Sequence, residues 1–220
     1  MTADFDPVDG SPSGLAPTET GTRKNLSCKG LVAAVVLAGG RSRRFGSDKL
    51  MASLDGVPLL DHAVAALPSD WLVIMVGPVR PISSQHEIIT VREQPPGSGP
   101  AAALVTGFIA ALEHGAEQVV TLPGDAPGGG LAARRLITAL AERGPDAVVV
   151  GVDPGGVEQP LQLALTGEPL HRLARRTDVV DLGARRLLAD LDDYRRLPLG
   201  AGLVADIDTR DDLDRLRRLG

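Results

Sequence analysis

The sequence predicts an α/β fold in which a mostly parallel sheet lies between two layers of helices. Short apolar runs rich in valine, typical of strands buried on both faces, recur along the chain from residue 31. Segments with apolar residues at helical spacing separate these runs, and alternation of the two patterns favours a parallel sheet. At 220 residues, the chain has the length of one ordinary domain.

Each strand is predicted from an unbroken apolar run that ends at glycine, proline or a charged residue. The first run, 31–38, holds three valines and stops at a glycine pair. The predicted strands are 31–38, 71–76, 88–91, 118–122, 147–152, 162–165, 194–198 and 203–205.

The helices are predicted from apolar residues recurring every three or four positions. Pro58 and Pro100 suit the first turn of a helix, and Gly144-Pro145 suits the end of one. Thr209 with Asp212 resembles a capping box that begins the last helix. The predicted helices are 58–67, 100–114, 131–143, two short segments within 171–191, and a last helix from 209.

Residues 1–30 are rich in Asp, Pro, Ser, Thr and Gly, so we expect a disordered leader before a single domain at 31–220. The single cysteine, Cys28, excludes an internal disulfide and a multi-cysteine zinc site, which fits a cytoplasmic location. No run approaches the roughly 18 apolar residues of a membrane span. The net charge of −5 gives no general attraction to nucleic acid.

Cations crowd the segment after the first strand. Gly39 and Gly40 let backbone N–H groups approach a ligand closely, and the cations that follow are Arg41, Arg43, Arg44 and Lys49. This combination favours a polyanion such as a triphosphate. The spacing matches neither a Walker A loop nor a dinucleotide fingerprint. An ordinary exposed basic turn is the alternative.

Three carboxylates also follow predicted strands. Asp125 comes after 118–122, between glycine and a proline-containing turn, and Asp206 and Asp208 come after 203–205. Ligands in open α/β sheets lie beyond the carboxyl ends of the strands, so we expect these side chains to face the basic segment across one cleft. Magnesium binds through few carboxylates plus substrate phosphates, and Asp125 suits that role. An ordinary turn aspartate is the alternative.

A second glycine-rich segment precedes the helix at 100–114. Gly97 and Gly99 match a relaxed dinucleotide formula, but the neighbouring prolines argue against that use. A loop that directs a helix N-terminus at a ligand fits the residues better. Glu93 lies just before it, either as a ligand-binding group or as a solvated loop charge.

Residues 37–49 resemble the signature loop of the molybdenum cofactor guanylyltransferases, roughly L-A-G-G-x-S-x-R-M-G-x-D-K, with Phe45 in place of methionine. The resemblance extends over about residues 35–213. It includes Asp125 in a metal-binding motif and Gln159-Pro160-Leu161 on the acceptor side. It also includes Asp206-Ile-Asp-Thr, where the family has N-x-N-T-P and this chain has Arg210 in place of the proline. It implies a Rossmann-like three-layer sandwich of the nucleotide-diphospho-sugar transferase type.

The resemblance implies transfer of GMP from GTP to the phosphate of a molybdopterin-type acceptor, with release of pyrophosphate and transient contact with molybdenum-cofactor enzymes. We expect Arg41 and Lys49 to neutralise phosphates, assisted by Arg44, and Asp125 to bind Mg²⁺. The expected metal ligands also include Asp208 and Asp206. The implied nucleotide-binding residues are Leu37, Ala38, Gly39, Gly40, Arg44, Lys49, Glu93, Gly99 and Asp125.

Two other functions stay open at this point. Glu93 stands where the family usually has aspartate, and Asp206 and Asp208 replace asparagines. The D-x-D-T form recurs in related enzymes, so a cytidylyltransferase or a sugar-phosphate nucleotidyltransferase is one alternative. A non-catalytic nucleotide-binding protein is the other, and the presence of both Lys49 and Asp125 argues against it.

Overall fold

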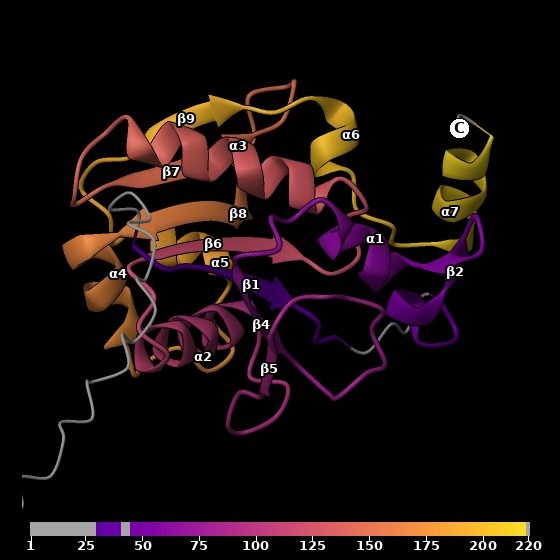
Figure 1. The fold of residues 1–220 in the computed structure, drawn as a ribbon, viewed down its shortest axis with the longest axis horizontal. Coiled ribbons are helices and arrows are strands. Elements are labelled where there is room, and N and C mark those ends of the chain that lie inside the picture. Colours follow the sequence, from indigo (N-terminus) through magenta and orange to yellow (C-terminus); the bar gives the residue numbers. More distant parts are fainter. Residues whose placement is uncertain (1–29, 41–44, 219–220) are drawn as a thin grey trace, which may run out of the picture.

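The computed structural model describes residues 30–40 and 45–218. A seven-stranded sheet with the order β5-β4-β1-β6-β8-β7-β9 forms its centre (Figure 1). Every neighbouring pair is parallel except the two pairs made by β8. The strands are β1 (Val32–Leu37), β4 (Leu72–Val76), β5 (Ile88–Val91), β6 (Gln118–Pro123), β7 (Val148–Val152), β8 (Glu158–Thr166) and β9 (Arg195–Pro198).

Helices cover both faces of this sheet. The longer ones are α2 (Pro100–Glu113) and α3 (Gly129–Ala141), which lie on opposite faces because they pack into different hydrophobic cores. The others are α1 (Leu59–Ala65), α4 (Gly167–Ala174), α5 (Ala184–Leu188), α6 (Ala201–Val204) and α7 (Arg210–Arg217). The predicted three-layer α/β architecture with a mostly parallel sheet is therefore confirmed.

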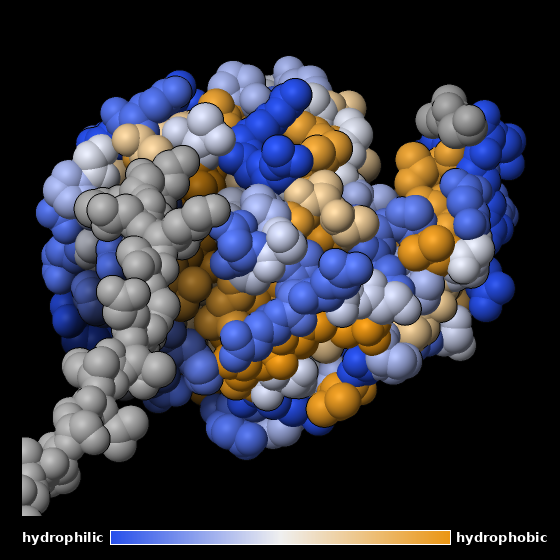
Figure 2. All heavy atoms as spheres, viewed as in Figure 1, coloured by the Kyte–Doolittle hydropathy of each residue, from blue (hydrophilic) through white to orange (hydrophobic). Residues whose placement is uncertain are grey.

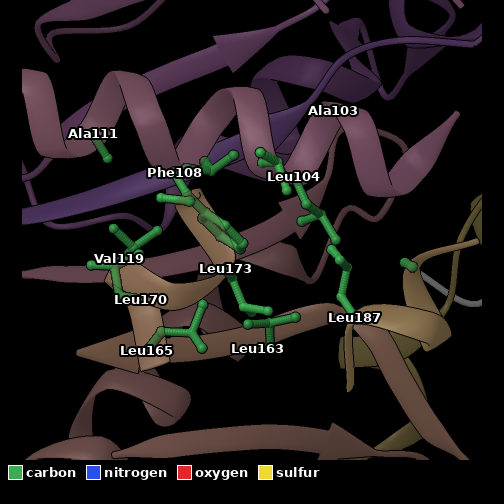
Figure 3. Close-up of a cluster of buried hydrophobic side chains, with 14 of the residues drawn as sticks. Ala103, Leu104, Phe108, Ala111, Val119, Leu163, Leu165, Leu170, Leu173 and Leu187 are labelled. Atoms are coloured by element: carbon green, nitrogen blue, oxygen red, sulfur yellow. The ribbon is translucent and has the colours of Figure 1, made fainter. Parts of the chain in front are cut away.

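The two cores explain the unbroken apolar runs. Successive residues of β1 point to opposite faces, so Ala33 and Val35 enter one core while Ala34 and Val36 enter the other. The first core joins α2, α4 and α5 to the sheet, and Figure 3 shows Leu104 and Phe108 of α2 facing leucines from β8 and α4. A strand with helices on both faces has no solvent-exposed side, which is why polar alternation is missing.

A third, smaller cluster holds the last helix at the side of the molecule. Phe45, Leu54, Leu59, Ile207 and Leu213 form it, beside the short hairpin of β2 (Ser53–Leu54) and β3 (Val57–Pro58). Figure 1 shows α7 next to β2, and Figure 2 shows apolar residues on the side of α7 that faces the rest of the protein. The helix begins with the predicted capping box, made by Thr209 and Asp212.

Two element predictions need correction. The segment 203–205 is not a strand: residues Ala201–Val204 form α6, whose N–H groups bond within its own turn, and β9 is already the edge of the sheet. The strand predicted at 162–165 is longer, because residues from Glu158 onward pair with β7 across an irregularity at Val150 and Gly151. The leader 1–29 lies outside the described residues. No helix in the described part of the chain is long and apolar enough to cross a membrane.

Candidate active site

The carboxyl ends of β1 and β6 bring two of the predicted segments together. These strands pair in parallel with Leu37 opposite Pro123, and Gly124 N donates to Leu37 O at 3.0 Å. The segment that begins at Gly39 and the turn that carries Asp125 therefore leave the sheet side by side. This arrangement follows from parallel pairing, because equivalent ends of parallel strands share one edge of the sheet.

Lys49 forms ion pairs with the turn that carries Asp125 and with the C-terminal segment that carries Asp208. It lies in the short 3-10 helix η1 (Lys49–Met51), and its Nζ is 2.5 Å from Asp125 Oδ2 and 2.9 Å from Asp208 Oδ1. The side chains of Lys49 and Asp125 are only 15% and 18% exposed, whereas Asp208 is half-exposed at 52%. The cation and two of the three predicted carboxylates thus share one place.

The charges in this cluster shift one another's ionisation. Burial lowers the pKa of Lys49, but hydrogen bonds to Asp125 and Asp208 and their negative charges outweigh it, so the pKa is raised overall. Loss of hydration, reinforced by the charges of Asp208 and Asp125, raises the pKa of Asp206. Lys49 therefore stays protonated beside Asp125 and Asp208, and its positive charge is suited to neutralising phosphate groups.

Backbone contacts bring the C-terminal segment to Asp125. Ile207 N, between the two aspartates, donates to Asp125 O at 3.1 Å. Helix α6, which precedes Asp206 in the chain, packs closely on Gly128: a Cβ added to Gly128 would be 2.9 Å from Leu203 Cα. The buried Gln162 amide donates from Nε2 to Leu203 O at 2.7 Å. The positions of Asp206 and Asp208 therefore depend on tertiary contacts of α6.

A cavity of about 500 Å³ opens beside this cluster. Its lining residues come from the carboxyl ends of several strands and from the loop before α2; they include Leu37, Gly39, Gly40, Arg92, Glu93, Gly97, Gly99, Asp125 and Leu161. The Glu93 side chain is buried, and its Oε1 accepts a hydrogen bond from Gly97 N at 2.9 Å. Its Oε2 is also buried and has no hydrogen-bond partner among the described residues. A buried acceptor without a donor is costly unless a ligand supplies one.

Most of the predicted nucleotide-binding residues lie at this cavity, with two qualifications. Ala38 cannot offer its N–H to a ligand, because that group donates to Val76 O at 2.9 Å in the sheet. Gly39 and Gly40, in contrast, line the cavity. Arg41 and Arg44 lie outside the described residues.

One further residue near this site, Arg80, was not among the predicted site residues and follows β4. Its side chain is only 8% exposed, and its Nε donates to Asp48 Oδ2 at 2.7 Å, one residue before Lys49. Its Nη1 donates to Ala38 O. No motif surrounds Arg80, so the only possible signal was a lone arginine after the turn Gly77-Pro78, and such residues are usually solvated.

The donor set has the chemistry of a partial magnesium site. Residues 30–40 and 45–218 contain no group of three or more His, Cys, Asp or Glu residues that could hold a metal by themselves. Two carboxylates, from Asp125 and Asp208, nevertheless direct oxygens at one point, where the Lys49 ammonium now lies. Magnesium usually takes one or two carboxylates and completes its shell with phosphates and water, so the residues fit that ion.

Comparison with known proteins agrees with this architecture. The family model described as the MobA-like NTP transferase domain matches residues 34–195. A probable molybdenum cofactor guanylyltransferase of Mycobacterium avium is 32% identical over 192 residues, which cover 83% of this chain and 93% of that protein.

Solved structures share the fold. The Mycobacterium sp. strain JC1 homologue of Mycobacterium tuberculosis Rv0371c superimposes with a TM-score of 0.61 at 26% identity, over 86% of this chain and 96% of that one. A CMP:2-keto-3-deoxy-manno-octonic acid synthetase complexed with CTP reaches 0.63 at 13% identity, over 86% and 98%, which shows the fold alone. The fold is that of the nucleotide-diphospho-sugar transferases. The matched domain, the long mycobacterial relative and the site at the strand ends lead to one conclusion: the chain belongs to the MobA-like nucleotidyltransferase family.

Proposed function

We propose that the protein transfers GMP from GTP to the terminal phosphate of a molybdopterin-type acceptor and releases pyrophosphate. The observation that carries the proposal is the cluster of Lys49 with Asp125 and Asp208, beside a cavity of about 500 Å³ at the carboxyl ends of β1 and β6. Relatives that bear the name molybdenum cofactor guanylyltransferase support the choice of donor and acceptor.

The proposed roles at this site follow from the chemical groups that the residues present. Gly39 and Gly40 present backbone N–H groups to the nucleotide, and Lys49 neutralises the β- and γ-phosphates and the departing pyrophosphate. The resemblance assigns the same task to Arg41, with Arg44 assisting. Asp125 and Asp208 would hold Mg²⁺, which when bound stabilises charge that develops on the α-phosphate.

The acceptor needs little chemical help. A phosphate group is already ionised at neutral pH, so its oxygen attacks the α-phosphate without a general base, and pyrophosphate leaves on the opposite side. Positioning and charge neutralisation therefore account for the catalysis we assign to this site.

Glu93 supports guanine as the base. Its Oε2 is a buried acceptor without a donor among the described residues, and the carboxylate is held in place through Oε1. Guanine offers two neighbouring donors, the N1–H and the 2-amino group, whereas cytosine offers one amino group. The Oε2 atom has no other donor among the described residues, so it gains most from the base with more donors.

A cytidylyltransferase that uses the same acceptor is the second candidate, because Asp206 and Asp208 are carboxylates where the guanylyl family has asparagines. Pyrophosphate release measured with GTP, CTP, ATP and UTP, with Mg²⁺ and with or without molybdopterin, separates the two. We expect release with GTP and acceptor only. Preference for CTP would establish the second candidate, and binding without release would make the protein a non-catalytic nucleotide-binding protein.

Two variants test the roles. Asp125→Ala should abolish turnover while the circular dichroism spectrum stays native, and near-normal turnover would end the metal assignment. Glu93→Gln should reduce the preference for GTP over ITP, which lacks the 2-amino group, by about tenfold or more, because the carboxylate acceptor becomes partly a donor. Glu142→Gln, on an exposed ion pair with Arg195, is the matched control and should leave that preference unchanged.

A further inference from the structure

Arg80 joins the two ends of the signature loop, residues 37–49. Its Nη1 donates to Ala38 O, at the end of β1, and also lies 3.4 Å from Pro78 O. Its Nε donates to Asp48 Oδ2 at 2.7 Å, and Asp48 directly precedes Lys49. One guanidinium therefore joins the strand end that precedes the glycine pair to the turn that carries Lys49.

The turn before Arg80 is shaped for this contact. Gly77 has φ +151°, and a Cβ there would be 2.5 Å from Ala38 O and 2.9 Å from Gly39 N. Only glycine lets the loop after β4 pass this close to the end of β1. Three residues after Gly77, the Arg80 side chain contacts the same carbonyl, Ala38 O.

We propose that Arg80 is a positioning residue, which holds Ala38 and Asp48 at a set separation and so directs Lys49 at Asp125. For its catalytic consequence this proposal rests on the proposed nucleotidyl transfer. Asp48 transmits the effect, since its Oδ1 accepts from Leu50 N at 3.3 Å and caps η1, the helix that begins with Lys49.

Direct contact between Arg80 and a phosphate does not account for these observations. The side chain is only 8% exposed and is not among the residues that line the cavity. Its Nε and Nη1 donors are already used by Asp48 and Ala38. The planar guanidinium fork can serve both acceptors at once, whereas a lysine ammonium is a compact point charge on a flexible stem.

Hydrogen–deuterium exchange in the nucleotide-free protein tests the positioning directly. The amides to follow are Ala38, which bonds to Val76 O, and Met51 and Ala52, which bond within η1. In Arg80→Ala, we expect these amides to exchange about tenfold faster or more, because a hydrogen bond to a charged group is lost. Arg143→Ala, which breaks an ion pair with Asp193 elsewhere, is the control and should leave them unchanged.

Two further variants keep the test decisive should Arg80→Ala fold poorly. Asp48→Asn retains the Oδ1 acceptor for Leu50 N but replaces the Oδ2 acceptor, so it should speed the exchange of the same amides without removing the cap. Arg80→Lys keeps the charge without the fork and should behave like Arg80→Ala. The proposal would be overturned if these amides exchanged at the unmutated protein's rate in all of these variants. It would also be overturned if Arg80→Lys kept that rate.

Kinetics connect the contact to catalysis. Both Arg80→Ala and Asp48→Asn should lower kcat/KM for the nucleotide about tenfold or more, and the double variant should lose little beyond either one, because the two residues act through a single bond. Losses that multiply would contradict a shared action. Because the exchange experiment contains no nucleotide, absence of turnover with every nucleotide would refute the proposed function without deciding the role of Arg80.

Discussion

Replacing Lys49 by methionine removes the ammonium that lies between Asp125 and Asp208 and keeps most of the apolar stem. The contact with Asp125 is largely shielded from water, so its loss costs about 1.5–3 kcal/mol, the range for hydrogen bonds to charged groups. The contact with the half-exposed Asp208 adds about 0.2–1 kcal/mol, as for surface pairs. Release of the buried ammonium offsets part of this.

We therefore expect Lys49→Met to lower the free energy of unfolding by about 1–3 kcal/mol in the nucleotide-free protein. For a domain of this size, that loss lowers Tm by roughly 3–9 °C, measured by calorimetry without divalent ions. Added Mg²⁺ should then raise Tm more in the variant than in the original protein, because Asp125 and Asp208 no longer share an ammonium.

The control for this experiment is Arg175→Met, which breaks an exposed ion pair with Glu168 and should cost under about 1 kcal/mol. A Lys49→Met variant that is as stable as this control, and whose Tm responds to Mg²⁺ no more than that of the original protein, would contradict these expectations. Such a result would mean that the two carboxylates do not depend on the ammonium and do not face a common cation.

Three further outcomes are expected. Gly77→Ala should lower stability by at least about 1 kcal/mol and slow turnover, since its Cβ would meet Ala38 O and its φ of +151° disfavours a side chain; thermal unfolding and kcat report the two effects. Gly128→Ala, whose Cβ would meet Gly202 O, should displace α6 and reduce turnover with less effect on nucleotide binding, checked by kinetics alongside calorimetry. Hydrogen bonds from the threonine hydroxyl and N–H at the helix N-cap lower the pKa of Asp212. That contribution is present above the unfolded pKa and is lost as pH falls through the folded value, so the amides of α7 should lose protection relative to those of α2 in acid. An unchanged ratio of protection factors between the two helices would count against it.

Much of the fold could be predicted from local patterns. The apolar run of β1 lacks polar alternation because helices cover both faces of that strand. This missing alternation predicted a central parallel strand. Thr209 and Asp212 form their capping box within four residues, so the sequence alone located the start of α7. The strand prediction for 203–205 is wrong, because three apolar residues do not distinguish a strand from one turn of helix.

Some residues of the candidate site could be predicted from the sequence and others could not. Lys49 and Asp125 could be identified because each follows a buried strand within a recognisable motif, and the ends of parallel strands meet at one edge. Arg80 and Gln162 could not, because the Ala38 and Leu203 carbonyls that they bond lie 42 and 41 residues away in the chain. Side-chain bonds of that kind leave no periodic trace in a sequence.

The amino-acid sequence by itself determined the layered α/β fold, the order of most strands and helices, and the presence of a glycine-and-cation segment and a strand-end carboxylate. These follow from periodicity and from turn chemistry, which act over a few residues. Only the tertiary structure decided that Asp208 shares the Lys49 ammonium with Asp125, that the Ala38 N–H is used within the sheet, and that Arg80 joins Ala38 to Asp48. Those contacts depend on how closely helices and loops pack on the sheet, and packing distances are set by the whole chain.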